Sequence, residues 1–70
     1  MLEGAIKVLY DTQVDVIKIV LSNERIEESD EEETGFIFDY ENNGNVVSIE
    51  ILNASHRIEN PRIFEYAVTV

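Results

Sequence analysis

The strongest constraint on the fold is the alternation of apolar and polar residues along segments rich in valine and isoleucine. More than half of the apolar residues are Val or Ile, whose branched Cβ atoms favour strands over helices. This period of two predicts strands near residues 5–10, 14–21, 35–41, 45–52 and 63–70, with a weaker one near 25–28. We therefore expect a mainly β fold, with an antiparallel sheet of about five to six strands built from two hairpins.

The clearest hairpin surrounds Asn43-Gly44, a pair that suits a two-residue type I′ turn. Counting outward from this turn predicts one apolar face with the cross-strand pairs Tyr40–Val47, Phe38–Ile49 and Phe36–Ile51. The opposite face then carries the pairs Asp39–Ser48 and Ile37–Glu50. A four-residue loop over 41–44 keeps the same faces with different partners. A three-residue loop with simple opposite pairing would set Phe38 against Ser48 and is not expected.

The first hairpin is predicted with its loop at 11–14, so that Val8 faces Ile17 and Ile6 faces Ile19. The other face of this hairpin is also partly apolar, and a strand that is apolar on both sides is usually covered on both sides. Near the C-terminus, residues 53–58 predict a short helical turn with Asn53 as its N-cap. The alternative is an α+β fold with a C-terminal helix.

Composition limits the classes of protein to which the chain can belong. It has 70 residues, with 15 Asp or Glu against 5 Lys or Arg, and a formal net charge of −10. This length makes one small β-rich domain over 1–70. Duplex nucleic acid is not an expected partner, because phosphate binding needs clustered Lys and Arg. The lack of Cys excludes disulfides and thiolate metal sites, and no cofactor is predicted.

No membrane segment is predicted either. The longest apolar stretch, 14–21, is interrupted by Asp15 and Lys18 and is far shorter than the roughly 20 residues that a spanning helix needs. No signal peptide is expected at the N-terminus, so we expect a cytoplasmic location. A chain of this size is close to the margin of stability. We therefore expect a homodimer that buries part of the Leu9, Val16 and Val20 face or the last strand.

The order of residues across most of the chain resembles a known family. The matching positions are Tyr10-Asp11, Asp15, Ile17, Ile19, Leu21, Gly35, Ile37, Asp39-Tyr40, Gly44, Val47, Ile49-Glu50-Ile51-Leu52 and Ala54-Ser55. From about Lys7 to Ile58 this pattern is similar to the small prokaryotic family called domain of unknown function 2283. The resemblance implies a compact β-rich fold and no established activity, so it supplies no catalytic residues. It also hints at small toxin-like proteins as neighbours.

Two pairs of carboxylates are candidate functional residues. Asp11 and Asp15 flank the first turn, where they could bind a divalent cation or simply cap the turn through the backbone. Asp39 and Glu50 lie on the same non-core face of adjacent strands. Such a pair can divide acid and base roles, or it can be part of a solvated strand face. No catalytic or metal-binding motif accompanies either pair, so the four remain a candidate carboxylate site.

Residues 27–33 form an acidic run with six carboxylates among seven side chains: Glu27, Glu28, Asp30, Glu31, Glu32 and Glu33. We predict a solvated loop or a frayed edge strand. The same run is a candidate docking surface for a basic protein partner. The basic cluster of His56, Arg57 and Arg62 could contact this run on a second subunit.

These features predict a non-enzymatic protein-interaction module that self-associates. Neutralisation of a basic partner, as an antitoxin does, is one form of that role. The alternative is a small-ligand or divalent-metal-dependent enzyme that uses Asp11, Asp15, Asp39 or Glu50 at a subunit boundary.

Overall fold

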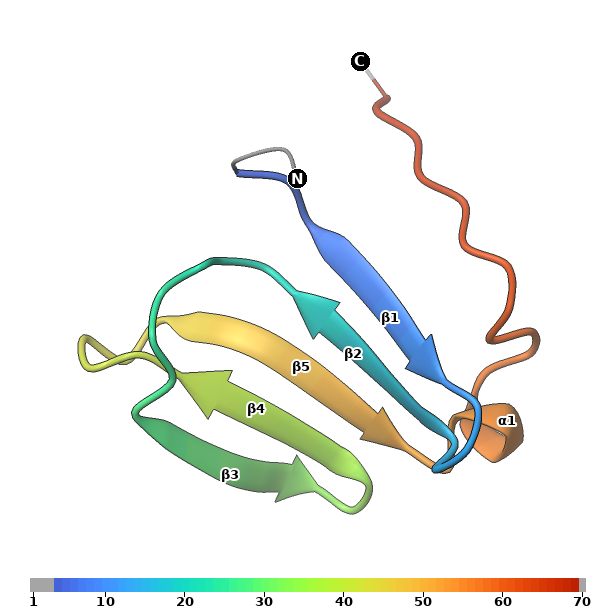
Figure 1. Cartoon of the computed structure of the whole chain (residues 1–70), viewed down its shortest axis with the longest axis horizontal. Helices are drawn as coiled ribbons and strands as arrows, with labels where there is room; N and C mark the ends of the chain where they lie inside the picture. The colour runs from blue at the N-terminus through green and yellow to red at the C-terminus, as the bar shows by residue number, and fades with distance from the viewer. Residues whose placement is uncertain (1–3, 70) are drawn as a thin grey trace.

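The computed structural model describes residues 4–69, whose strands form one antiparallel sheet. In chain order the elements are β1 (Lys7–Asp11), β2 (Val16–Val20), β3 (Glu28–Glu33), β4 (Phe36–Tyr40), β5 (Val46–Leu52) and α1 (Ala54–Arg57). The spatial order β1-β2-β5-β4-β3 places β1 and β3 at the two edges of the sheet (Figure 1). The mainly β antiparallel fold is thus confirmed. No helix within residues 4–69 has the length and apolar character to cross a membrane.

One face of the sheet carries the hydrophobic core. Its buried cluster of Ile17, Ile51 and Ala54 joins β2, β5 and α1. The partly buried residues around this cluster are Val8, Tyr10, Ile19, Phe36, Ile49 and Ile58. Alternate residues of each strand reach this face, as the period of two requires. The short helix α1 lies at one end of the sheet, where β5 ends (Figure 1).

The second hairpin has the predicted faces. Four pairs are observed in register: Phe36–Ile51, Ile37–Glu50, Phe38–Ile49 and Asp39–Ser48. The predicted pair Tyr40–Val47 is wrong, because a bulge sets Tyr40 opposite Val46. The type I′ turn is wrong as well, since Gly44 N–H donates to Glu41 C=O at 2.9 Å and Gly44 has the positive φ of 86°. Asn42 and Asn43 therefore occupy the centre of the turn, and the bulge restores the phase that the apolar face requires.

The first hairpin has the predicted faces but a different register. The observed pairs are Lys7–Val20, Val8–Ile19, Leu9–Lys18, Tyr10–Ile17 and Asp11–Val16. The predicted pairs of Val8 with Ile17 and Ile6 with Ile19 are therefore wrong by two residues. A shift of two preserves the faces of the strands. The cause is Asp15, which stays in the turn in a left-handed conformation with φ of 58°.

The C-terminal segment, defined here as residues 63–69, is not a strand. The strand predicted over 63–70 is therefore wrong for this segment, and Val70 lies outside the described residues. Within the described chain, the backbone hydrogen bond that involves this segment runs from Ile63 N–H to Asn60 C=O at 3.2 Å. Apolar and polar side chains alternate along the segment as in a strand. A strand also needs a neighbouring strand for its backbone hydrogen bonds, and the described chain places none beside this segment.

The acidic run is an edge strand, and the helical turn is present. The weak strand predicted near 25–28 is displaced to β3, which pairs with β4 along the sheet edge. The turn predicted over 53–58 forms α1. Asn53 occupies the N-cap position with φ of 53°, but its side chain makes no capping hydrogen bond.

Candidate functional site

The most distinctive surface of the molecule is the acidic edge, defined as the five carboxylates of β3: Glu28, Asp30, Glu31, Glu32 and Glu33. All six residues of β3 are exposed, and in the part of the chain that the structure describes no strand faces the outer backbone side of β3. Within residues 4–69 the ion pair found joins Arg25 to Glu27 at 3.3 Å. The carboxylates of β3 therefore repel one another without a paired cation in the described chain.

A row of hydrogen bonds holds this highly charged strand to the sheet. Ser29, the one uncharged residue of β3, donates its hydroxyl to Asp39 Oδ1 at 2.6 Å. Ser48 of β5 donates to Asp39 Oδ2 at 2.5 Å. Asp39 is 1% exposed, and both of its oxygens are occupied by hydroxyl donors. The row thus links β3, β4 and β5 through one buried carboxylate.

Two acidic side chains also stabilise the edge locally. Glu31 Oε2 accepts the Gly35 N–H at 2.8 Å in the turn to β4. The Tyr40 hydroxyl donates to Glu32 Oε2 at 2.7 Å. This hydrogen bond, together with burial and the nearby charges of β3, raises the pKa of Tyr40 to about 12. The hydrogen bond to Glu32 favours the protonated phenol, and the charges of Glu32, Asp30 and Glu28 add to this preference.

The structure brings Asp39 and Glu50 together, as the shared face predicted. Burial alone would raise the pKa of Asp39, but hydrogen bonds from Ser29, Ser48 and Glu50 outweigh it, and that pKa lies below its usual value. Burial, the hydrogen bond to Asp39 and the charge of Asp39 raise the pKa of Glu50. The two carboxyl groups therefore differ in proton affinity. Because Asp39 is enclosed by its hydroxyl donors, the arrangement favours a structural role for the pair.

Asp11 and Asp15 serve two separate turn contacts. Asp11 Oδ1 accepts the Gln13 N–H at 3.0 Å, which is an Asx turn. Asp15 Oδ1 accepts the Tyr10 hydroxyl at 2.7 Å and the Ser55 N–H at 3.0 Å. Asp15 Oδ2 accepts the Ser55 hydroxyl at 2.7 Å. These hydrogen bonds lower the pKa of Asp15 and fasten the first hairpin to α1.

No cluster of metal-ligating side chains was found in the part of the chain that the structure describes. Sequence reasoning set Ser48 opposite Asp39, as observed, but it missed Ser29 and Ser55 as partners of Asp39 and Asp15. Ser29 had a usable signal, because it is the single hydroxyl inside a run of carboxylates. Ser55 had no such signal, since it contacts Asp15 across 40 positions of sequence.

The basic cluster of His56, Arg57 and Arg62 is exposed to solvent in and near α1. The Arg57 guanidinium lies over the Phe36 ring at 5.2 Å, and that of Arg62 over the Tyr10 ring at 6.0 Å. His56 is exposed in α1. A contact of this cluster with the acidic edge of a second subunit stays a prediction.

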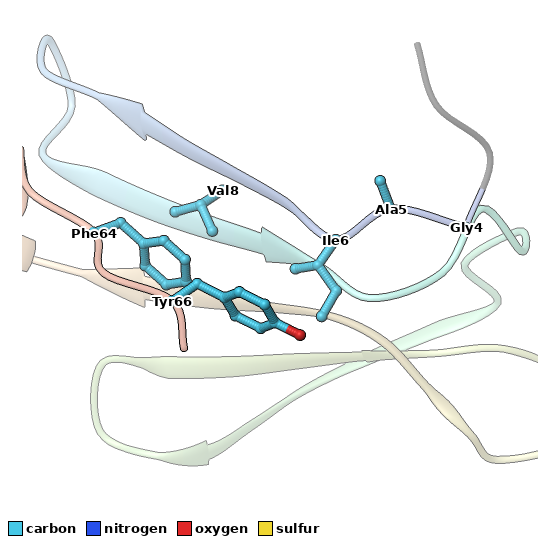
Figure 2. Close-up of a pocket in the computed structure, with 6 residues that line it drawn as sticks. All are labelled: Gly4, Ala5, Ile6, Val8, Phe64 and Tyr66. Carbon is cyan, nitrogen blue, oxygen red and sulfur yellow. The ribbon is translucent and has the colours of Figure 1, made fainter. Parts of the chain in front are cut away.

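An apolar groove lies between the C-terminal segment and the β1 side of the sheet. It has a volume of about 470 Å³ and is lined by Gly4, Ala5, Ile6, Val8, Phe64 and Tyr66. Figure 2 shows Phe64 and Tyr66 projecting from the C-terminal segment toward the side of β1 that carries Val8. The groove lies at the edge of the sheet opposite the acidic edge.

The comparisons with known proteins give a family and no activity. The model of the family described as "Protein of unknown function (DUF2283)" matches residues 7–55. The chain belongs to this family. No curated protein and no solved structure matches it. The match includes all five strands and ends at Ser55, so the C-terminal segment lies beyond it.

Proposed function

We propose that this member of the family is a non-enzymatic protein-interaction module that self-associates and binds a basic, extended segment of a partner at β3. The observation that carries the proposal is an edge strand with five carboxylates and an open backbone. Such an edge can accept another strand through main-chain hydrogen bonds. Neutralisation of a basic partner, in the manner of an antitoxin, is the biological form we propose for this binding.

The chemistry of the edge favours a cationic partner over another copy of β3. Two acidic strands side by side would add like charges to an edge that already lacks paired cations. A strand with alternating Lys or Arg residues would meet Glu28, Asp30 and Glu32, which alternate along β3. The anchoring of Ser29 to Asp39 keeps this strand ordered before binding, which reduces the entropy cost of association.

A short synthetic peptide that alternates Lys and Val tests this docking surface. We expect amide shifts confined to β3 and β4 in NMR titrations, and an affinity that falls as the salt concentration rises. The Glu28→Gln/Asp30→Asn variant should bind the peptide several-fold more weakly. The control variant Glu24→Gln/Glu59→Gln removes the same charge from exposed positions outside β3 and should bind as the parent does. Equal weakening in both variants would show a general charge effect and would overturn the proposed surface.

A further inference from the structure

The C-terminal segment has the pattern of a strand without the pairing of one. Its apolar side chains are largely exposed, with Phe64 at 64% and Tyr66 at 72%. Two aromatic side chains in water cost free energy that burial would recover. The segment is therefore a candidate for a partner strand.

The neighbouring edge of the sheet, formed by β1, also has an unpaired backbone and exposed apolar side chains. Among residues 4–69, no strand pairs with the outer side of β1. Ile6, just before β1, is 55% exposed, and with Val8 it lines the apolar groove (Figure 2). Figure 1 shows the C-terminal segment returning along this side of the sheet. It makes no backbone hydrogen bond to β1 in the described residues.

We propose that the apolar groove is a homodimer interface in which the C-terminal segment of a second copy docks against the β1 edge. The inference rests on the self-association part of the proposed function and names its surface. The chain exposes 5676 Å², whereas a folded monomer of 8.0 kDa is expected to expose about 4,450 Å². The excess of about 1,200 Å² exceeds the roughly 800 Å² that each partner buries in a standard interface.

Charge selects β1 over β3 as the acceptor edge. Glu65 is the one charged side chain of the C-terminal segment, and Lys7 is the cation of β1. On the acidic edge Glu65 would meet further carboxylates, which is unfavourable. Reciprocal docking in a dimer with two-fold symmetry would bury both segments and both β1 edges at once.

The first experiment measures the mass of the full chain by light scattering over a micromolar dilution series. We expect a dimer, and we expect Phe64→Ser/Tyr66→Ser to raise its dissociation constant roughly tenfold or more. Ile63→Ser is the matched control, because Ile63 is as exposed as these residues but does not line the groove. Circular dichroism checks that each variant keeps the sheet.

The second experiment uses the absence of cysteine in the chain. Val8→Cys and Tyr66→Cys are placed on separate chains, one of them isotopically labelled, and the mixture is oxidised. We expect a disulfide between the two different chains, well above the yield of a mixture of Asn43→Cys with Tyr66→Cys. A second preparation carries Val8→Cys and Tyr66→Cys on the same chain. Absence of the cross-link between chains, or a cross-link solely within the chain of this double variant, would overturn the proposal.

These experiments distinguish self-association itself from the surface that mediates it. A parent chain that stays monomeric at micromolar concentration would overturn both self-association and its proposed surface. A parent dimer that Phe64→Ser/Tyr66→Ser leaves unchanged would keep self-association and reject the groove. The peptide titration at β3 is independent of both results.

Discussion

The two edge strands, β1 and β3, occupy equivalent positions in the sheet and have opposite chemistry. β1 carries the consecutive apolar residues Val8, Leu9 and Tyr10, and exposed and half-buried side chains alternate along it. β3 has no apolar residue at all. Within the described residues, each of these strands is paired on one side and open on the other. The backbone therefore offers the same hydrogen-bonding edge twice, and the side chains decide which partners can use it.

The two edges are also fastened to the molecule in different ways. β1 contributes Val8 and Tyr10 to the apolar face around the core, so burial holds it. β3 buries no side chain and depends on its pairing with β4 and on the Ser29–Asp39 hydrogen bond. The comparison teaches that an edge strand can remain ordered without hydrophobic burial when one buried carboxylate anchors it.

Removal of that carboxylate should have the largest effect. Asp39→Ala leaves the Ser29 and Ser48 hydroxyls without their acceptor, and we expect a loss of about 2–3 kcal/mol in the free energy of unfolding. Urea denaturation measures this loss. Hydrogen exchange should show the amides of β3 opening more than those of β1. Asp30→Ala, at an exposed position of β3, should change stability little, and an equal loss there would contradict the anchoring role of Asp39.

The hairpin of β4 and β5, which carries Asp39 and Ser48, was largely predictable from the sequence. Alternation with a hairpin turn between Tyr40 and Val46 placed Asp39, Ser48 and Glu50 on one face, because side chains repeat with a period of two. The bulge at Tyr40 was not predictable. The number of residues between the two strands fits a two-residue turn, and it fits equally well a longer turn followed by a bulge.

The hairpin of β1 and β2 was predicted less well, because its register depends on a contact between residues far apart in the sequence. The register depends on Asp15, whose carboxylate binds Ser55 from the far end of the chain. Counting outward from a turn uses neighbours in sequence and cannot include such a contact. The C-terminal segment illustrates the same limit, because its alternation is real but the strand that would pair with it is not supplied by the described chain.

The turn that closes β3 onto β4 gives the second prediction. Gly35 has φ of 86°, and a Cβ there would meet the guanidinium of Arg57. We expect Gly35→Ala to cost about 1–2 kcal/mol, because an L-residue is strained at this φ and the Arg57 guanidinium must also shift from its place over Phe36. Gly44→Ala is the matched control, with the same φ of 86° and nothing within 4 Å of the added Cβ. Thermal unfolding should rank Gly35→Ala as the more damaging change, and the reverse order would argue against the packing of Arg57 over this turn.

The smallest expected effect concerns Glu50, which lies between Lys18 on the β1 side and Ile37 on the β3 side. Its pKa is raised by burial and by Asp39, so the stability it contributes is present below its unfolded pKa and is lost as the pH rises through its folded pKa. The lowered pKa of Asp39 acts in the opposite direction, with stability present above its unfolded pKa and lost as the pH falls through its folded pKa.

Gln resembles the neutral, protonated form of Glu50, so Glu50→Gln keeps the first contribution at every pH and leaves that of Asp39 in place. The variant's stability should exceed that of the parent by a few tenths of a kcal/mol near neutral pH, and the difference should vanish at about pH 4, near the ordinary pKa of a glutamate. Urea denaturation at both pH values measures this difference, with the exposed Glu59→Gln as control. A variant less stable than the parent at neutral pH would mean that attraction between Lys18 and Glu50 outweighs repulsion from Asp39. Attraction between Lys18 and Glu50 would then join β2 to β5, in addition to the hydrogen-bonded row that links β5, β4 and β3.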